Sequence, residues 1–222
     1  MTTTFPDYET AAARAAETLI KFHIDSAPVA PLPVLKSLRG VIVLSFAEMA
    51  ESAGMDRQNV ITLFGDGNHD AVTTAKVSDG KLRYVVAYNQ RLPFYMLQRA
   101  LARELGHIML RHDGTRTETV RTEEAVCFAR HFLCPRPLVK LLQESDIPVT
   151  VELIGNITGC YERCLTGIRR TPGAHVPAEL NRIIKDQFRA YVDNFIDAYS
   201  ILAGGDESAA ADFGTFMDNY ID

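Results

Sequence analysis

Two residues about one helical turn apart, Glu104 and His107, are the strongest sign of chemistry in this sequence. In the helix of a zinc peptidase, two histidines four residues apart bind the metal from one face, and the glutamate that follows the first histidine is the general base. Glu104 stands at the base position and His107 at the second ligand position, whereas Arg103 stands at the first. The stretch 102–107 therefore has the zinc-peptidase pattern with one ligand replaced.

The following apolar-periodic segment holds the candidates for further metal ligands. Glu123 and Glu124 are two acids, either of which matches the carboxylate that often completes such a site. Cys127 and His131 share a helical face with Glu124, and their thiolate and imidazole groups suit zinc, so each is a candidate substitute for the missing ligand. The structural alternative, which we favour, is that Cys127 packs as a small apolar residue and that His131 points to solvent.

The order of these features resembles the ImmA/IrrE family of zinc metallopeptidases. Ala102–His107 is similar to the family's Ala-His-Glu-Leu-Gly-His, with arginine for the first histidine. The similarity covers roughly residues 7–170. Pro33–Val43 is similar to the family's opening, and Tyr88–Asn89 to the end of the strand before the site helix. The family's Glu-Ala-x-x-Phe-Ala-x-x-Leu-Leu-x-Pro signature is similar to Glu123–Ala125, Phe128–Ala129 and Phe132–Pro135.

The resemblance implies a zincin-like α+β fold, a single zinc ion, and cleavage of a repressor protein that carries a helix-turn-helix. By position, Glu104 would be the general base, and His107 and Glu124 would be metal ligands. Glu123 is the alternate ligand, because Glu124 is the acid that directly precedes the alanine of the signature. The resemblance also implies that a sheet edge next to the site helix accepts an extended segment of the substrate.

That edge is expected near Tyr88 and Asn89, because the strand 81–88 ends just before the site helix. We therefore predict that this strand or its neighbour is exposed along one side. Strand addition at such an edge gives affinity through backbone hydrogen bonds.

Arg103 is the departure from the family pattern. A guanidinium group stays protonated, has no lone pair and repels a divalent cation, so it cannot bind zinc. His107 and Glu124 alone fall short of the three protein ligands of catalytic zinc sites. We expect a degenerate site that is metal-free or holds zinc poorly, in a protein that binds its regulatory partner with weak or no cleavage. We also expect Arg103 to pair with Glu124, or else with Glu123 or Glu104, where the metal would stand.

Two alternative functions stay open. The first is an active zinc endopeptidase that recruits a substitute ligand. His112 is not a candidate for that ligand, because five residues of continuous helix place it about 140° further round than His107. The second is a DNA-binding regulator that uses 149–170, where two short helices flank a turn.

The charge distribution argues against nucleic acid as a partner. The chain has 23 Lys and Arg, 28 Asp and Glu, and a net charge of -5. Five of the acids lie in 206–222, which has no basic residue, so the rest of the chain is neutral. Binding to nucleic acid is driven by neutralisation of phosphates, which a neutral body does not favour.

The elements that position the candidate site follow from hydrophobic periodicity. Helices are predicted over 7–24, 32–38, 93–112 (the site helix), 122–133, 149–155, 160–170 and 177–202. Strands are predicted over 41–46, 71–77 and 81–88, the last two joined at Asp79-Gly80, so we expect a small, mostly antiparallel sheet packed with helices. We divide the chain into a peptidase-like domain, a helical C-terminal subdomain packed on it, and an acidic tail, which are 1–140, 141–203 and 204–222.

Composition agrees with a globular protein. Of 222 residues, 47% are hydrophobic and 23% charged, and no apolar stretch approaches the ~20 residues that span a bilayer. The first nine residues lack the basic region and apolar core of a secretory signal. We therefore expect a cytoplasmic protein with no membrane contact, in which the four cysteines are reduced.

Overall fold

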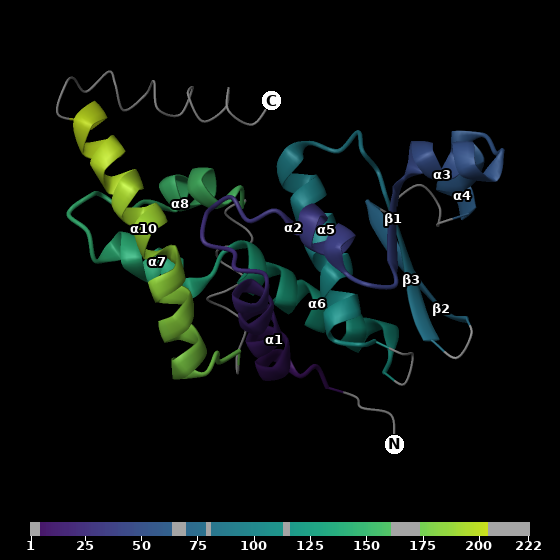
Figure 1. Ribbon diagram of the computed structural model, residues 1–222, viewed down its shortest axis with the longest axis horizontal. Coiled ribbons are helices and arrows are strands. Elements are labelled where there is room, and N and C mark those ends of the chain that lie inside the picture. The colour runs from purple at the N-terminus through teal and green to yellow at the C-terminus, as the bar shows by residue number, and fades with distance from the viewer. Residues whose placement is uncertain (1–4, 64–69, 79–80, 113–115, 161–173, 204–222) are drawn as a thin grey trace.

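The chain forms an α+β structure in which a small sheet lies at one end and a group of helices at the other (Figure 1). The computed structural model describes residues 5–63, 70–78, 81–112, 116–160 and 174–203. The elements in these ranges are α1 (Tyr8–Lys21), α2 (Pro31–Ser37), β1 (Val41–Ser45), α3 (Phe46–Ala53), α4 (Arg57–Leu63), β2 (Ala71–Ser78), β3 (Lys81–Tyr88), α5 (Phe94–Met109), α6 (Glu118–Leu133), α7 (Arg136–Gln143), α8 (Val151–Thr158) and α10 (Ala178–Ala203).

The sheet has three strands in the order β1-β3-β2 within the described ranges. β2 pairs with β3 antiparallel, as the Asp-Gly turn predicts, with Ala71 opposite Tyr88. β1 pairs with β3 parallel, because the chain crosses over through α3, α4 and β2 before it returns, so the sheet is mixed rather than mostly antiparallel. β3 is thus the central strand, and β2 is an outer strand.

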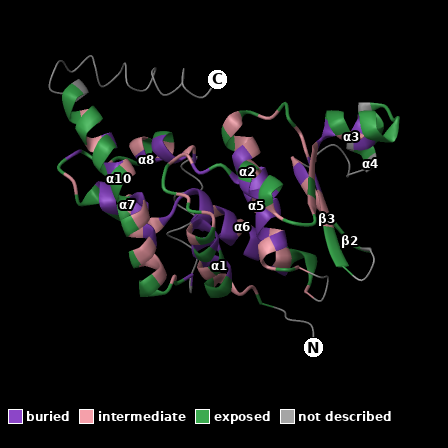
Figure 2. Cartoon of the chain, viewed as in Figure 1, coloured by how far each residue is buried: buried purple, intermediate pink, exposed green. Residues whose placement is uncertain are grey.

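The two faces of the sheet pack against different helices. Val86 of β3 faces Leu101 and Leu105 of α5 in the main hydrophobic core. The next residue, Ala87, points to the opposite face and packs with Phe46 and Ala50 of α3 in a separate cluster. This alternation follows from the two-residue period of a strand. Figure 2 shows the lower part of β2 in green, the colour of exposed residues.

α5 and α6 pack closely together, and a glycine allows it. A Cβ atom on Gly106 would lie 3.1 Å from the carbonyl oxygen of Ala125 and 3.1 Å from the ring of Phe128. α6 begins at Glu118, four residues before the predicted start, because the hydroxyl of Thr117 accepts a hydrogen bond from the amide of Val120. The close approach of the two helices brings the candidate site residues on α5 and α6 into one region.

The helices of the C-terminal part share the main core with the N-terminal part. α10 packs against α7 and α1, and its Phe188 is buried in the same cluster as Leu19 and Leu142. The predicted boundary after residue 140 falls inside α7, and the predicted acidic tail lies outside the described residues. In the part of the chain that the structure describes, no helix has the length and apolar character needed to cross a bilayer.

Three helices were not predicted from the sequence, namely α3, α4 and α7. For α3 a signal exists: Ser45 and Glu48 form a capping box, in which each side chain accepts a hydrogen bond from the other's backbone amide. For α7, Pro137 suggests a stop, but it lies in the first turn of the helix, where a missing N–H costs nothing.

Candidate functional site

A cleft of about 740 Å³ opens between β2 and the two helices α5 and α6. β2 supplies one wall, and α5 supplies Glu104 and His107, the two residues of the zinc-peptidase pattern. The other described residues that line it are Ala71, Val72, Thr73, Ala75, Val77, Leu82, Tyr84, Arg103, His112, Glu118, Arg121 and Thr122. The cleft therefore combines an exposed strand with a charged floor.

Arg103 lies in this cleft and pairs with its neighbour in sequence. Its Nε donates a 2.9 Å hydrogen bond to Oε1 of Glu104, and its Nη2 donates to the carbonyl oxygen of Ala71, also at 2.9 Å. Of the three acids expected as partners, the structure selects Glu104; Glu124, the first choice, has another partner. The guanidinium thus ties α5 to the start of β2 and compensates the charge of Glu104.

Glu104 is almost fully buried, with a relative exposure of 3%. Burial raises the pKa of its carboxyl group because the charged form loses hydration, and the charge and hydrogen bond of Arg103 oppose that rise. A general base benefits from a raised pKa, but this carboxylate already accepts a hydrogen bond from a permanent cation.

A backbone reversal after α5 brings His112 into the cleft. α5 ends at Met109, and Arg111 adopts a left-handed conformation with φ 53°. The reversal places the His112 ring against His107, with 2.8 Å between the two Nδ1 atoms. The prediction that His112 faces away from His107 is therefore wrong, because it extrapolates a helix that has ended three residues earlier.

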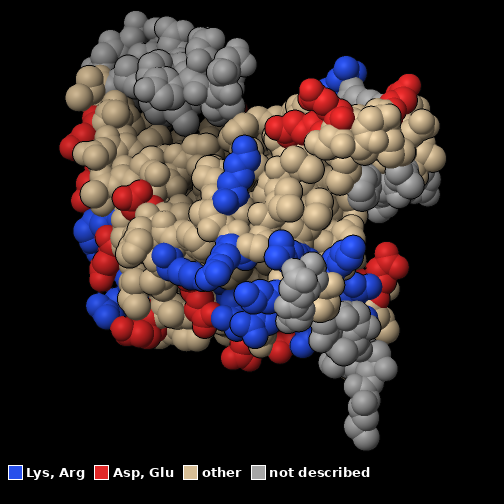
Figure 3. Space-filling view, turned by 45° about the vertical axis from the view of Figure 1, so that its right-hand side comes forward, with Lys and Arg blue, Asp and Glu red and all other residues tan. Residues whose placement is uncertain are grey.

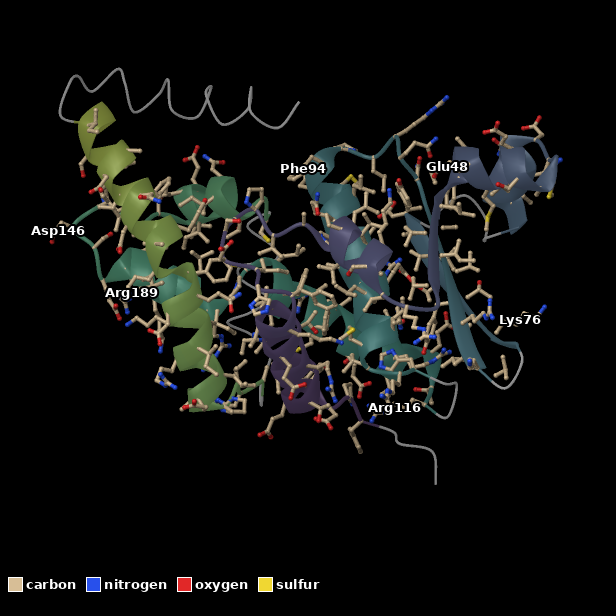
Figure 4. The ribbon with its side chains drawn as sticks, in the orientation of Figure 1. Glu48, Lys76, Phe94, Arg116, Asp146 and Arg189 are labelled. Atoms are coloured by element: carbon tan, nitrogen blue, oxygen red, sulfur yellow. The ribbon has the colours of Figure 1, made fainter. Side chains whose placement is uncertain are left out.

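Glu124 is the centre of a buried polar network, and its side chain is 1% exposed. Oε1 accepts hydrogen bonds from the backbone amide of Asp7 at 2.7 Å and from the guanidinium of Arg116. Oε2 lies 3.0 Å from Nε2 of His112. Figure 4 labels Arg116 near the start of α6. The ion pair expected at Glu124 is present, but its cation comes from Arg116 instead of Arg103.

Glu123 lies outside this network. Its carboxylate accepts a hydrogen bond from the hydroxyl of Tyr8, and this bond raises the pKa of Tyr8 to about 12. The structure therefore places Glu124, and not Glu123, in one cluster with His107 and His112, as the position of Glu124 in the signature implies.

The proton positions in this cluster follow from its geometry. An ionised carboxylate only accepts, so Nε2 of His112 donates to Glu124. In a neutral ring Nδ1 of His112 then accepts, and Nδ1 of His107 donates to it. Burial, with the charges of His112, Arg103 and Arg121, lowers the pKa of His107 to about 3, so its ring is neutral near pH 7. Of the nitrogens of these two rings, only Nε2 of His107 keeps a free lone pair.

These residues do not fit a zinc ion in this arrangement. Both nitrogens of His112 are engaged, by two different partners, and Glu124 is neutralised by Arg116. Within the described ranges, no group of three His, Cys, Asp or Glu side chains converges so as to hold a metal. A zinc site needs at least three protein donors with free lone pairs directed at one point, and of the two imidazole rings here only that of His107 has a free nitrogen.

Cys127 and His131, the proposed substitute ligands, do not line the cleft. Cys127 is buried with Ala11 and Ala12 of α1, and burial raises the pKa of its thiol to about 12, so it behaves as a small apolar residue. His131 is 4% exposed, so the expectation that it points to solvent is wrong. Burial lowers the pKa of His131 to about 4.

Tyr88 and Asn89 lie at the end of the central strand and not on an edge. Tyr88 pairs with Ser45 of β1 on one side and with Ala71 of β2 on the other. Oδ1 of Asn89 accepts a 3.1 Å hydrogen bond from the amide of Arg91, which fixes the turn that leads into α5. The outer strand beside the cleft is the neighbour, β2, which was the second alternative in the prediction.

Sequence reasoning missed His112 and Arg116 as site residues. For His112 a signal was present. The apolar stripe of α5 ends at Ile108, because the positions three and four residues further on, Arg111 and His112, are polar. For Arg116 the signal was Thr117, whose N-cap role starts α6 earlier and brings the preceding residue to Glu124. The helix-turn-helix predicted over 149–170 falls partly on α8, which ends at Thr158 with Gly159 as its C-cap, and otherwise mainly on 161–170, outside the described residues.

Comparison of the chain with protein-family models, with curated proteins and with solved structures finds no match in any of the three.

Proposed function

We propose that this protein is an ImmA/IrrE-type, zincin-like protein with a degenerate zinc site, which binds an extended segment of a regulatory, repressor-type protein and cleaves it weakly or not at all. The observation that carries the proposal is that arginines pair with both acids of the pattern: Arg103 with Glu104, and Arg116 with Glu124. Two guanidinium groups there disfavour a divalent cation, and without the metal the water that would attack a peptide bond is not activated.

The strand β2 supports the binding part of this proposal. It pairs with β3 on one side, and on the other side no strand covers it among the described residues. An outer strand leaves a row of backbone N–H and C=O groups unpaired, which can bind an extended chain. Since Thr73, Ala75 and Val77 of β2 line the cleft, a segment added there would lie against Glu104 and His107.

Zinc titration of a reverted variant tests the proposal. Arg103→His places two imidazoles one turn apart on α5 and removes one cation. We expect calorimetry to find no zinc binding by the wild type and about one zinc per chain for Arg103→His. The matched control is Arg99→His, which adds a histidine one turn earlier on α5, where Arg99 pairs with Asp70 instead. Zinc bound by the wild type would contradict the proposal. Zinc bound by none of the three proteins would mean that the geometry of the site has drifted beyond a single residue.

A second candidate function is an active zinc endopeptidase, and His112 is the observation that favours it. Its ring lies next to both His107 and Glu124, so a turn of the ring and loss of the Arg116 pair would give three donors. A His112→Asn variant separates the two functions. If the wild type binds zinc and cleaves, and His112→Asn loses both, the protein is an enzyme with His112 as the substitute ligand.

A further inference from the structure

Among the described residues, one cation in the cleft, Arg121, has no counter-ion. Arg121 lines the cleft from α6, and its Nε is buried without a hydrogen-bond partner in the part of the chain that the structure describes. Glu118 lies one turn earlier on the same helix and also lines the cleft, yet the described salt bridges do not join these two residues. A buried donor of a charged group that lacks a hydrogen-bond partner destabilises the folded protein. The presence of Arg121 at this place therefore points to a bound molecule that supplies the acceptor.

Apart from Glu118, the other acids in and beside the cleft are paired with arginines. Arg103 pairs with Glu104, and Arg116 pairs with Glu124. His107 is neutral, and the positive charge of Arg121 is one of the reasons for its low pKa. Figure 3 shows Lys and Arg side chains gathered in a band across the middle of the face that it presents. Arg121 therefore leaves a positive potential in the cleft that an acidic group would complement.

The hairpin end of the same cleft is apolar and exposed. Val77 and Leu82 are directly opposite each other on β2 and β3, and both line the cleft. Their relative exposures are 67% and 48%, high for large apolar residues beside one another. Lys76, the neighbour of Val77, points away from the molecule in Figure 4, as the alternation of a strand requires.

We propose that the cleft binds an extended peptide segment that carries an acidic side chain, which pairs with Arg121, and an apolar side chain, which packs on Val77 and Leu82. The segment would add to β2 as a further antiparallel or parallel strand. This inference rests on the proposed function and gives it a substrate class: an acidic, apolar-alternating segment of the partner protein. Charge complementarity at Arg121 is what selects this occupant over a basic or purely apolar one.

Fluorescein-labelled ten-residue peptides of alternating valine and threonine, with glutamate, glutamine or lysine at the centre, are suitable probes of the full chain. We expect fluorescence anisotropy to show the glutamate peptide bound about 10-fold more tightly than the glutamine peptide, since charged hydrogen bonds contribute more than neutral ones. Arg121→Gln should remove this difference. Arg189→Gln, on the exposed side of α10, is the matched control and should keep it.

A second pair of variants tests the apolar contact. Val77→Thr keeps the shape of an exposed side chain but makes it polar, and it should weaken binding of the glutamate and glutamine peptides alike by a few-fold. Ile42→Thr is its control, because Ile42 is similarly exposed, at 52%, but lies on β1 at the other side of the sheet. Both substitutions are on the surface and should leave the unfolding transition unchanged.

The outcomes separate the two levels of the proposal. Equal binding of the glutamate and glutamine peptides by the wild type, with a loss in Val77→Thr, would overturn the acidic preference and keep the strand-addition function. Failure of all three peptides to bind would overturn both. Binding of the lysine peptide in preference would overturn the assignment of Arg121 as the selecting residue.

Discussion

Glu104 and Glu124 are both buried acids on the facing helices α5 and α6, yet their surroundings differ. Glu124 accepts hydrogen bonds from the start of α1, which is far away in sequence, and from two residues in the connection between α5 and α6. Glu104 has one cation, Arg103, which comes from the residue next to it. The pKa of Glu104 is raised by burial in spite of this cation.

The difference indicates that Glu124 stabilises the fold, whereas Glu104 belongs to the candidate functional site. Glu124 links three elements, so its network stabilises their arrangement as long as every member is satisfied. Glu104 lines the cleft, and the hydrogen bond of its partner Arg103 to Ala71 links only α5 and β2. His131 is a third buried ionisable group. It differs from both acids because its Nε2 has no hydrogen-bond partner among the described residues.

The largest expected effect is that of Glu124→Ala. The substitution leaves Arg116, His112 and the amide of Asp7 without their acceptor. Breaking one side of a buried ion pair typically costs about 3–5 kcal/mol. Urea unfolding monitored by circular dichroism should show a loss of this size, whereas Glu123→Ala, at the exposed neighbouring position, should cost less than about 1 kcal/mol. Similar losses for the two variants would mean that the Glu124 network does not hold the fold.

A second effect concerns pH and His131. Burial lowers its pKa to about 4 in the folded protein from the ordinary 6.5 of a solvated histidine, so the unfolded chain binds more protons between these values. The free energy of unfolding should therefore fall as the pH drops from 6.5 towards 4, by at most about 1.4 kcal/mol per pH unit for each such histidine. His107, with a pKa of about 3, adds to the same trend.

Urea unfolding at a series of pH values measures this dependence. His131→Gln, which cannot take up a proton there, should show a shallower slope over pH 4 to 6.5, whatever its stability at pH 7. An unchanged slope in His131→Gln would show that His131 is hydrated or protonated in the folded state.

A smaller effect is expected for Glu104→Gln. The amide oxygen can still accept from Nε of Arg103, and the loss of charge removes the cost of burying a carboxylate. We expect the free energy of unfolding at pH 7 to change by less than about 1 kcal/mol, far less than for Glu124→Ala. A loss as large as that of Glu124→Ala would remove the distinction between the two acids.

The smallest expected effect is that of Arg111→Gly. Arg111 holds a left-handed conformation, which costs a residue with a side chain roughly 1 kcal/mol and costs glycine nothing. The variant should gain a fraction of this in stability, since glycine also loses more entropy on folding. The chemical shifts of the His112 ring should stay in place, because the reversal that brings it to His107 is kept. Displacement of these signals would mean that the Arg111 side chain, and not its backbone, positions His112.

Helices and strands could be predicted from the sequence where hydrophobic periodicity and capping or turn residues indicate the same element. Asp7 caps α1, β2 and β3 on either side of Asp79-Gly80 pair antiparallel, and α10 is predicted to within one residue at each end. The parallel pairing of β1 was not predictable in the same way, because it depends on a crossover through two helices with weak signals. Short helices such as α4 are stabilised by packing more than by their own propensity.

The candidate site was predictable only where its residues lie on continuous helices. Glu104 and His107 follow from spacing along α5, the resemblance implies Glu124 on α6, and the structure brings the three to one region. His112 and Arg116 lie in the connection between these helices, where one left-handed residue changes which side chains meet. Glu124 pairs with Arg116 and not with Arg103 because of how the helices pack, which residue spacing alone does not predict.

The hydrogen bond from Asp7 to Glu124 joins residues that are 117 positions apart. On a ribosome that adds ~5–20 residues per second, α1 waits on the order of ten seconds before its partner helix is made. Throughout that time the alanine-rich face of α1, which packs against α6 and α10 in the finished protein, has nothing to cover it. The first helix of this chain thus docks only after more than half of the chain is made, and its stripe of small residues is less prone to associate during synthesis than a stripe of leucines would be.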